Sequence, residues 1–139
     1  DLKIVYEETI DGFDLDLEDI GIKKAVLSIN AVNTIPLAME IKNENISALD
    51  ANGNVINDID VTVEGNITES KDGKTETSSL INITLKETTE GAIGKLDGLK
   101  LKVTAISGQA TDVQLLSSQW LQLKDMKLKI PNGIKVDLN

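Results

Sequence analysis

The sequence of 139 residues contains no cysteine, no histidine and no arginine. Without cysteine and histidine, the usual zinc and copper sites lose their ligands, and catalytic triads built on these residues are impossible. Without arginine, no bidentate clamp for phosphate or carboxylate can form. The chemistry that remains is that of carboxylates, of lysines and of metal ions held by oxygen ligands.

Aromatic residues and positive charge are also scarce. Tyr6, Phe13 and Trp120 are the only aromatic residues, and 23 acidic residues against 14 lysines give a net charge of −9. Proteins that bind nucleic acid need a basic stripe, so the composition disfavours nucleic acid as a partner. It also disfavours an anionic membrane surface, and no run of 18 apolar residues is present that could insert into a bilayer.

Aliphatic residues are abundant, with 17 Leu, 17 Ile and 9 Val. This length fits a single domain over residues 1–139 with an aliphatic core, and the many β-branched residues favour strands. The chain begins at Asp1 and has no leader pattern, so we expect it to be a processed or excised part of a longer protein.

Apolar residues alternate with polar ones in seven short runs, as in strands with one buried face. Asp-Gly and Asn-Gly pairs between the runs supply the positive φ angles of tight turns. No long helical pattern separates the runs, so the sequence predicts an all-β, antiparallel β-sandwich of immunoglobulin-like or Greek-key type. The runs cover residues 13–17, 35–41, 59–63, 81–85, 99–105, 126–130 and 134–138.

Residues 88–97 depart from this alternation. Thr88 or Thr89 can cap a helix, Ile93 and Leu96 are three residues apart, and Gly98 can end it. We therefore expect one short helix near residues 88–97, at an end of the sandwich.

The last long run changes its parity. Leu121 and Leu123 occupy odd positions, whereas Met126, Leu128 and Ile130 occupy even ones. A β-bulge near residues 124–125 would bring both sets onto the core.

Two acidic segments could bind calcium. Asp50, Asn52 and Asn54 surround Gly53, but the sixth and twelfth positions counted from Asp50 are valines, so a hairpin tip is the better interpretation. The acidic run at residues 11–19 could bind a hard cation or could form a charged strand edge that discourages pairing.

Trp120, the single tryptophan, shares its strand parity with Gln122. An exposed tryptophan with polar neighbours can bind a sugar ring, whereas a lone tryptophan more often covers an end of the core. No convergent catalytic group can be identified among the many acidic residues, so we expect no enzymatic activity and no cofactor. Three Asn-x-Ser/Thr sequons, at Asn45, Asn66 and Asn82, are frequent enough by chance to carry little weight.

Three segments carry a resemblance to a known group of proteins: residues 15–43, residues 48–56 ("ALDANGNVI"), and "LKLKVTA" through "LQLKDMKLKIPNGIKVDL". Together they resemble β-sandwich modules of cell-envelope lipoproteins from gut Bacteroidetes. The Asn33-Thr34-Ile35-Pro36-Leu37 element is also similar to the Asn-x-x-Pro-Leu element of late-embryogenesis-abundant-like sandwich domains. The first resemblance implies residence at the outer membrane or outside the cell, and tethering through an upstream lipidated cysteine. It implies an accessory, adhesive or glycan-handling role.

The sequence therefore favours a non-enzymatic, extracytoplasmic binding or structural module whose partner is a glycan or a cell-surface protein. One alternative is a carbohydrate-binding accessory domain that uses Trp120 and Gln122. The other is an assembly module in which a terminal strand, at residues 2–8 or 132–138, pairs with a neighbouring molecule.

Overall fold

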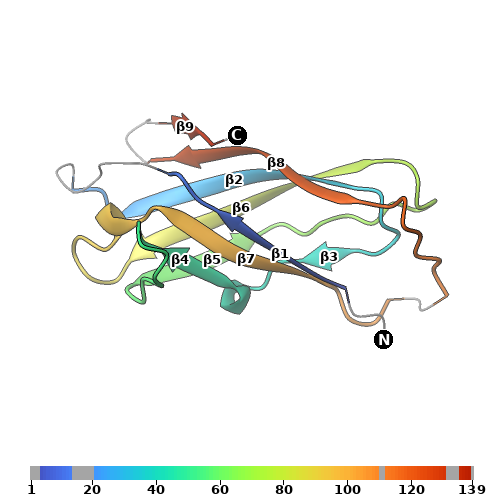
Figure 1. Cartoon of the computed structure of the whole chain (residues 1–139), viewed down its shortest axis with the longest axis horizontal. Coiled ribbons are helices and arrows are strands. Elements are labelled where there is room, and N and C mark those ends of the chain that lie inside the picture. Colours follow the sequence, from blue (N-terminus) through green and yellow to red (C-terminus); the bar gives the residue numbers. More distant parts are fainter. Residues whose placement is uncertain (1–3, 14–20, 110–111, 131–134, 139) are drawn as a thin grey trace.

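A computed structural model describes residues 4–13, 21–109, 112–130 and 135–138. Two antiparallel β-sheets pack against each other, which confirms the predicted all-β sandwich (Figure 1). Sheet A has β7 at its centre, β1 on one side of it and both β3 and β4 on the other, and sheet B has the order β5-β6-β2-β8-β9. The strands are β1 Val5–Ile10, β2 Lys24–Asn33, β3 Met39–Glu40, β4 Ile46–Leu49, β5 Ile59–Glu64, β6 Thr77–Glu87, β7 Gly98–Ala105, β8 Leu121–Lys129 and β9 Lys135–Asp137, with 3₁₀ turns at Asn43–Asn45 and Ile93–Lys95.

The inner strands follow the order of an immunoglobulin constant domain, in which strands A, B, E and D form one sheet and C, F and G the other. Strands β2, β6 and β5 occupy the places of B, E and D, and β4 and β7 occupy those of C and F. The places of the first and the last immunoglobulin strand are taken by strands from the opposite end of the chain. The first strand, β1, lies beside β7, where an immunoglobulin domain has its last strand, and β8 lies beside β2, where it has its first.

The core consists of the aliphatic side chains that the two sheets turn toward each other. Leu27, Ile83, Leu85 and Leu99 have no exposed surface, and the Leu99, Leu101 and Val103 series of β7 is buried as its alternation predicts. Strand β2 was not apparent from the alternation because its outer face is also largely covered: Ser28 and Val32 are buried between β6 and β8. A strand at the centre of a sheet need not alternate.

The predicted run at residues 35–41 is a strand only at Met39–Glu40, and the longer prediction is wrong. Pro36 has no N–H to donate, and the N–H of Ile35 donates to the side chain of Asn33 instead of to a neighbouring strand. The alternation nevertheless reports burial correctly, since Leu37, Met39 and Ile41 are all buried.

The parity change in β8 is a bulge, as predicted. Ser28 pairs with Lys127 and Asn30 with Lys124, so that two residues, Asp125 and Met126, lie opposite Ile29. Asp125 has a φ of 53°, which turns the strand locally. Leu123 and Met126 are both buried as a result.

The segment 88–97 forms the short helical element expected there, as a single 3₁₀ turn at Ile93–Lys95. Within the predicted run at residues 13–17, Phe13 is buried but belongs to no strand, and residues 14–17 lie outside the described residues. The predicted run at residues 134–138 corresponds to β9, which pairs with β8.

Candidate functional site

Trp120 lies at the end of the sandwich where β2 finishes and β8 begins. The backbone N–H of Trp120 donates to the hydroxyl of Thr34 at 2.8 Å, and the backbone carbonyl of Trp120 accepts from the N–H of Thr34 at 2.9 Å. Thr34 is buried, so these bonds hold the Trp120 backbone on the core while 39% of the residue remains exposed. Gln122, two residues further on, is exposed on the outer face of β8 opposite Val32.

The loop before Trp120 exposes two leucines beside polar residues. Leu115 and Leu116 are 40% and 44% exposed, so three of the six large exposed hydrophobic residues in the described part of the chain lie between positions 115 and 120. Gln119 closes this loop, because its amide accepts from Leu116 N–H at 3.1 Å and donates to the carbonyl of Gln114 at 3.3 Å. We call Leu115, Leu116 and Trp120 the Trp120 surface.

Asn33 supports this end of the molecule from inside. It is fully buried, and its amide donates to the carbonyls of Ile35 and Thr68, both at 3.0 Å, and accepts from Ile35 N–H at 2.9 Å. The Asn33-to-Leu37 element therefore has a structural role here, because Asn33 supplies the hydrogen bonds that a strand neighbour would otherwise make.

The side chains of Gln109 and Asp72 also hydrogen-bond to backbone groups. The amide of Gln109 accepts from the N–H of Ala38 at 2.7 Å and donates to its carbonyl at 2.9 Å, as an adjacent strand would. The carboxylate of Asp72 accepts from Lys74 N–H at 2.9 Å and from Thr75 N–H at 2.7 Å. Hydrogen bonds from Thr75 and from the Lys74 backbone hold the pKa of Asp72 well below its usual range.

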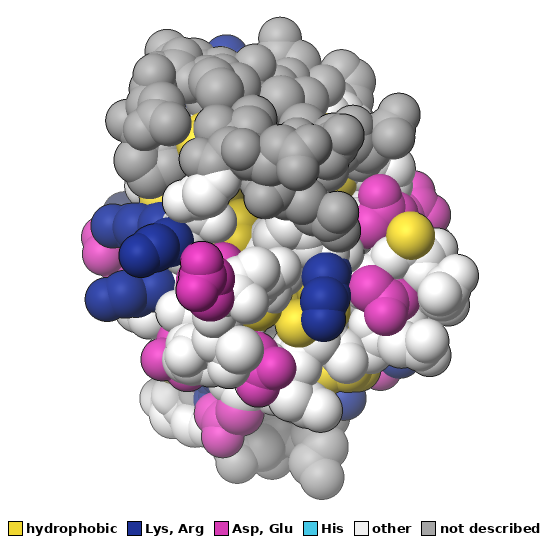
Figure 2. All heavy atoms as spheres, turned by 90° about the vertical axis from the view of Figure 1, so that its left-hand side faces the viewer, with side chains coloured by type: hydrophobic (Ala, Val, Ile, Leu, Met, Phe, Trp, Pro, Cys, Tyr) yellow, Lys and Arg dark blue, Asp and Glu magenta, His cyan; other side chains and the backbone are white. Residues whose placement is uncertain are grey.

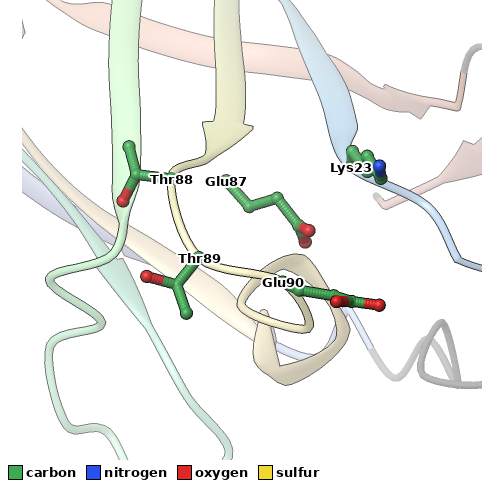
Figure 3. Close-up of a pocket in the computed structure, with 5 residues that line it drawn as sticks. All are labelled: Lys23, Glu87, Thr88, Thr89 and Glu90. Atoms are coloured by element: carbon green, nitrogen blue, oxygen red, sulfur yellow. The ribbon is translucent and has the colours of Figure 1, made fainter.

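A shallow, polar hollow lies at the opposite end of the sandwich, where β2 begins and β6 ends. Its lining consists of Lys23, Glu87, Thr88, Thr89 and Glu90 (Figure 3). Both oxygens of Glu87 are engaged, one with Ile93 N–H at 3.1 Å and the other with Gly91 N–H at 3.3 Å. Glu87 thus caps the turn that leads into the 3₁₀ segment, which leaves Glu90 and Lys23 as the charged groups that a ligand could meet there.

The Asp50 segment is a hairpin tip, as its turn chemistry predicts. One carboxylate oxygen of Asp50 accepts from the N–H groups of both Asn52 and Asn54, each at 2.9 Å, and Gly53 has a φ of 80°. Of the acidic run at residues 11–19, Asp11 is exposed and residues 14–19 lie outside the described residues. In the described ranges, no group of three or more carboxylates is arranged to hold a metal ion.

The fold and the site define an antiparallel β-sandwich that exposes Trp120 and two leucines on a hydrogen-bonded loop at one end. None of the helical segments in the described residues is long and apolar enough to cross a bilayer. Comparison with protein-family models, with curated proteins and with solved structures found no match to this chain.

Proposed function

We propose that the chain is a non-enzymatic binding module that contacts a cell-surface protein through the Trp120 surface. The observation that supports this most directly is that Leu115, Leu116 and Trp120 are all exposed within one loop that Gln119 closes. Exposed apolar clusters commonly mark interaction sites, and tryptophan is enriched among the residues that contribute most to binding. The cell envelope is the compartment that the resemblance to lipoprotein modules implies for such a role.

The hydrogen bonds of the loop support the same role. The Thr34 and Gln119 hydrogen bonds hold the backbone of residues 114–120 before any partner arrives. A surface that is already ordered loses less conformational entropy on binding, so more of the contact free energy contributes to affinity.

Photo-crosslinking on intact cells of the source organism tests this proposal. A photo-reactive phenylalanine analogue replaces Leu116 in one protein and the exposed Thr9 of sheet A in a second, matched protein. We expect a discrete protein adduct from position 116 only, which excess wild-type protein suppresses and excess Trp120→Ser protein does not. Equal adducts from both positions, or equal competition by both proteins, would contradict the proposal.

A carbohydrate-binding role is the second candidate, supported by the exposed Gln122 near the exposed Trp120. An aromatic ring beside an amide can stack on a sugar and hydrogen-bond its hydroxyl groups. The single tryptophan makes its fluorescence a direct reporter, and a neutral polysaccharide bound there should shift its emission. Gln122→Ala should weaken that binding about tenfold, as expected for one lost hydrogen bond. The exposed Gln114→Ala should not weaken it. If no polysaccharide changes the emission of Trp120, the carbohydrate-binding role is excluded.

Assembly through a terminal strand has less support. Both terminal strands are already paired, β1 with β7 and β9 with β8. The free edge of β1 also carries Glu8 on its inward side, where one carboxylate oxygen accepts from Tyr6 at 3.0 Å and the other is buried without a partner among the described residues. Inward-pointing charges on an edge strand oppose edge-to-edge pairing. A molar mass in solution that increases with protein concentration would restore assembly through a terminal strand as an alternative.

A further inference from the structure

Four lysines gather on the outer face of sheet B. Lys24 of β2 lies directly opposite Lys86 of β6, while Lys129 and Lys127 of β8 lie opposite Val26 and Ser28 of β2. All four are exposed, and their positions alternate with the inward residues of the same strands. We call Lys24, Lys86, Lys127 and Lys129 the lysine face. The end view in Figure 2 shows several lysine side chains close together on one side, with acidic side chains next to them.

This grouping is unfavourable for the isolated protein. Directly opposed residues of antiparallel strands have Cβ atoms about 5 Å apart, and like charges in that position destabilise the sheet. The chain has 23 acidic residues that could have been placed beside these lysines. The register brings Asp60 opposite Lys86 and Asp137 of β9 opposite Lys127, but it also places Lys129 opposite Lys135 of β9. The ion pair between Lys102 and Glu7, at 3.6 Å, belongs to sheet A.

We propose that the lysine face binds a linear polysaccharide that carries carboxylate or sulfate groups. Lys24 and Lys129, each of which lies opposite another lysine, then receive a counter-charge that no directly opposed residue provides. Lysine offers a mobile point charge rather than a rigid fork, which suits a polymer whose anionic groups are regularly spaced but flexible. The neutral residues Asn82 and Thr84 of β6 lie on the same outer face and can hydrogen-bond sugar hydroxyl groups.

Other polyanions fit this face less well. Strands β2, β6 and β8 have neighbours on both sides, so their backbone groups are already paired and a peptide cannot add as a further strand. Single-stranded nucleic acid is normally held by stacking on aromatic rings. The three aromatic residues of this chain, Tyr6, Phe13 and Trp120, belong to β1, to the segment after it and to the loop before β8.

Affinity chromatography on dextran sulfate, on polygalacturonate and on uncharged dextran tests the proposal. At a low salt concentration of about 25 mM, where surface charges are weakly screened, we expect retention on one or both charged polymers and none on dextran. Replacing the four lysines of the lysine face by glutamine should lower the affinity at least about tenfold, because each lost contact lowers the number of counterions that binding releases. That variant is Lys24→Gln, Lys86→Gln, Lys127→Gln and Lys129→Gln.

A matched control changes the net charge equally at four other exposed lysines, and should lower the affinity less than about threefold. These are Lys42→Gln, Lys71→Gln, Lys74→Gln and Lys100→Gln. Equal losses in the two variants, or no retention of the wild-type protein on either charged polymer, overturn the proposal. Tighter binding to phosphatidylserine vesicles or to single-stranded DNA than to both polymers also overturns it.

The single substitution Lys24→Glu separates binding from folding. It places an opposite charge beside Lys86, so the urea midpoint of unfolding should rise while retention on the charged polymer falls. A protein that loses retention because it has unfolded would show the reverse change in its midpoint. Unchanged retention together with a raised midpoint would show that the lysines have no part in binding.

Discussion

The two ends of the sandwich are closed by different kinds of contact. At the Trp120 end, the buried or half-buried polar side chains of Asn33, Thr34 and Gln109 bond to backbone groups that no strand reaches. At the Glu87 end, the apolar side chains of Ile93 and Leu96 fill the opening between the sheets. Hydrogen bonds fix direction and distance, whereas apolar packing mainly supplies free energy.

This difference bears on the binding surface that we propose. A loop held by directional bonds keeps its exposed side chains in one arrangement, as at Leu115, Leu116 and Trp120. The apolar end instead buries its large side chains and exposes the polar hollow lined by Glu87 and Lys23. If the two ends act independently, a change at one should leave the other intact.

The largest effect is expected from the apolar end. Ile93 has no exposed surface, and Ile93→Ala should lower the free energy of unfolding by about 2–5 kcal/mol through lost burial and a residual cavity. Urea unfolding measures this loss. The emission maximum of Trp120 in the folded protein should not move, since Trp120 lies at the other end; a shift would show that the ends are coupled.

A substitution at the polar end should lower stability as well, but it should also change the emission of Trp120. Asn33→Ala leaves the N–H of Ile35 and the carbonyl of Thr68 without their partner, which should cost about 2–3 kcal/mol. The emission of Trp120 should shift, because Thr34, which holds the Trp120 backbone, is the next residue. The exposed Asn57→Ala is the control and should change stability by less than about 0.5 kcal/mol. An unmoved emission in Asn33→Ala would contradict the role given to the polar network.

Some parts of this fold could be predicted from the sequence and others could not. The apolar alternation predicts β5, β6, β7, the latter part of β8 and its bulge, because these strands have one buried and one exposed face. It does not reveal β2, whose central position covers both faces, and it extends β3 too far because Asn33 replaces a strand neighbour beside Pro36.

The candidate site was harder to predict for a related reason. The sequence indicates Trp120 because it is the single tryptophan, but it does not indicate Leu115 and Leu116, since two adjacent leucines in a loop carry no periodic signal. The lysine face depends on which strands are neighbours. Lys24 and Lys86 are 62 positions apart, and only the β2–β6 register brings them together.

A smaller effect should follow from the cap at the apolar end. Glu87→Gln keeps the size of the side chain but removes the charge that two N–H groups meet, so it should cost about 0.5–1.5 kcal/mol. The exposed neighbour Glu90→Gln is the matched control and should have little effect. Urea unfolding compares the two. If both variants are equally stable, Glu87 does not cap the turn.

The smallest effect concerns Asp72, and its sign depends on pH. The folded protein holds the pKa of Asp72 below the ordinary value of 3.8, so the folded state binds a proton less readily than the unfolded state. The stability that Asp72 contributes is therefore complete above about pH 4 and is lost as the pH falls further. The difference in unfolding free energy between the wild type and Asp72→Asn should shrink from about pH 7 to about pH 3. For the exposed Asn57→Ala, which removes no titratable group, we expect no such trend, and a pH-independent difference at Asp72 would show that its hydrogen bonds do not require the ionised carboxylate.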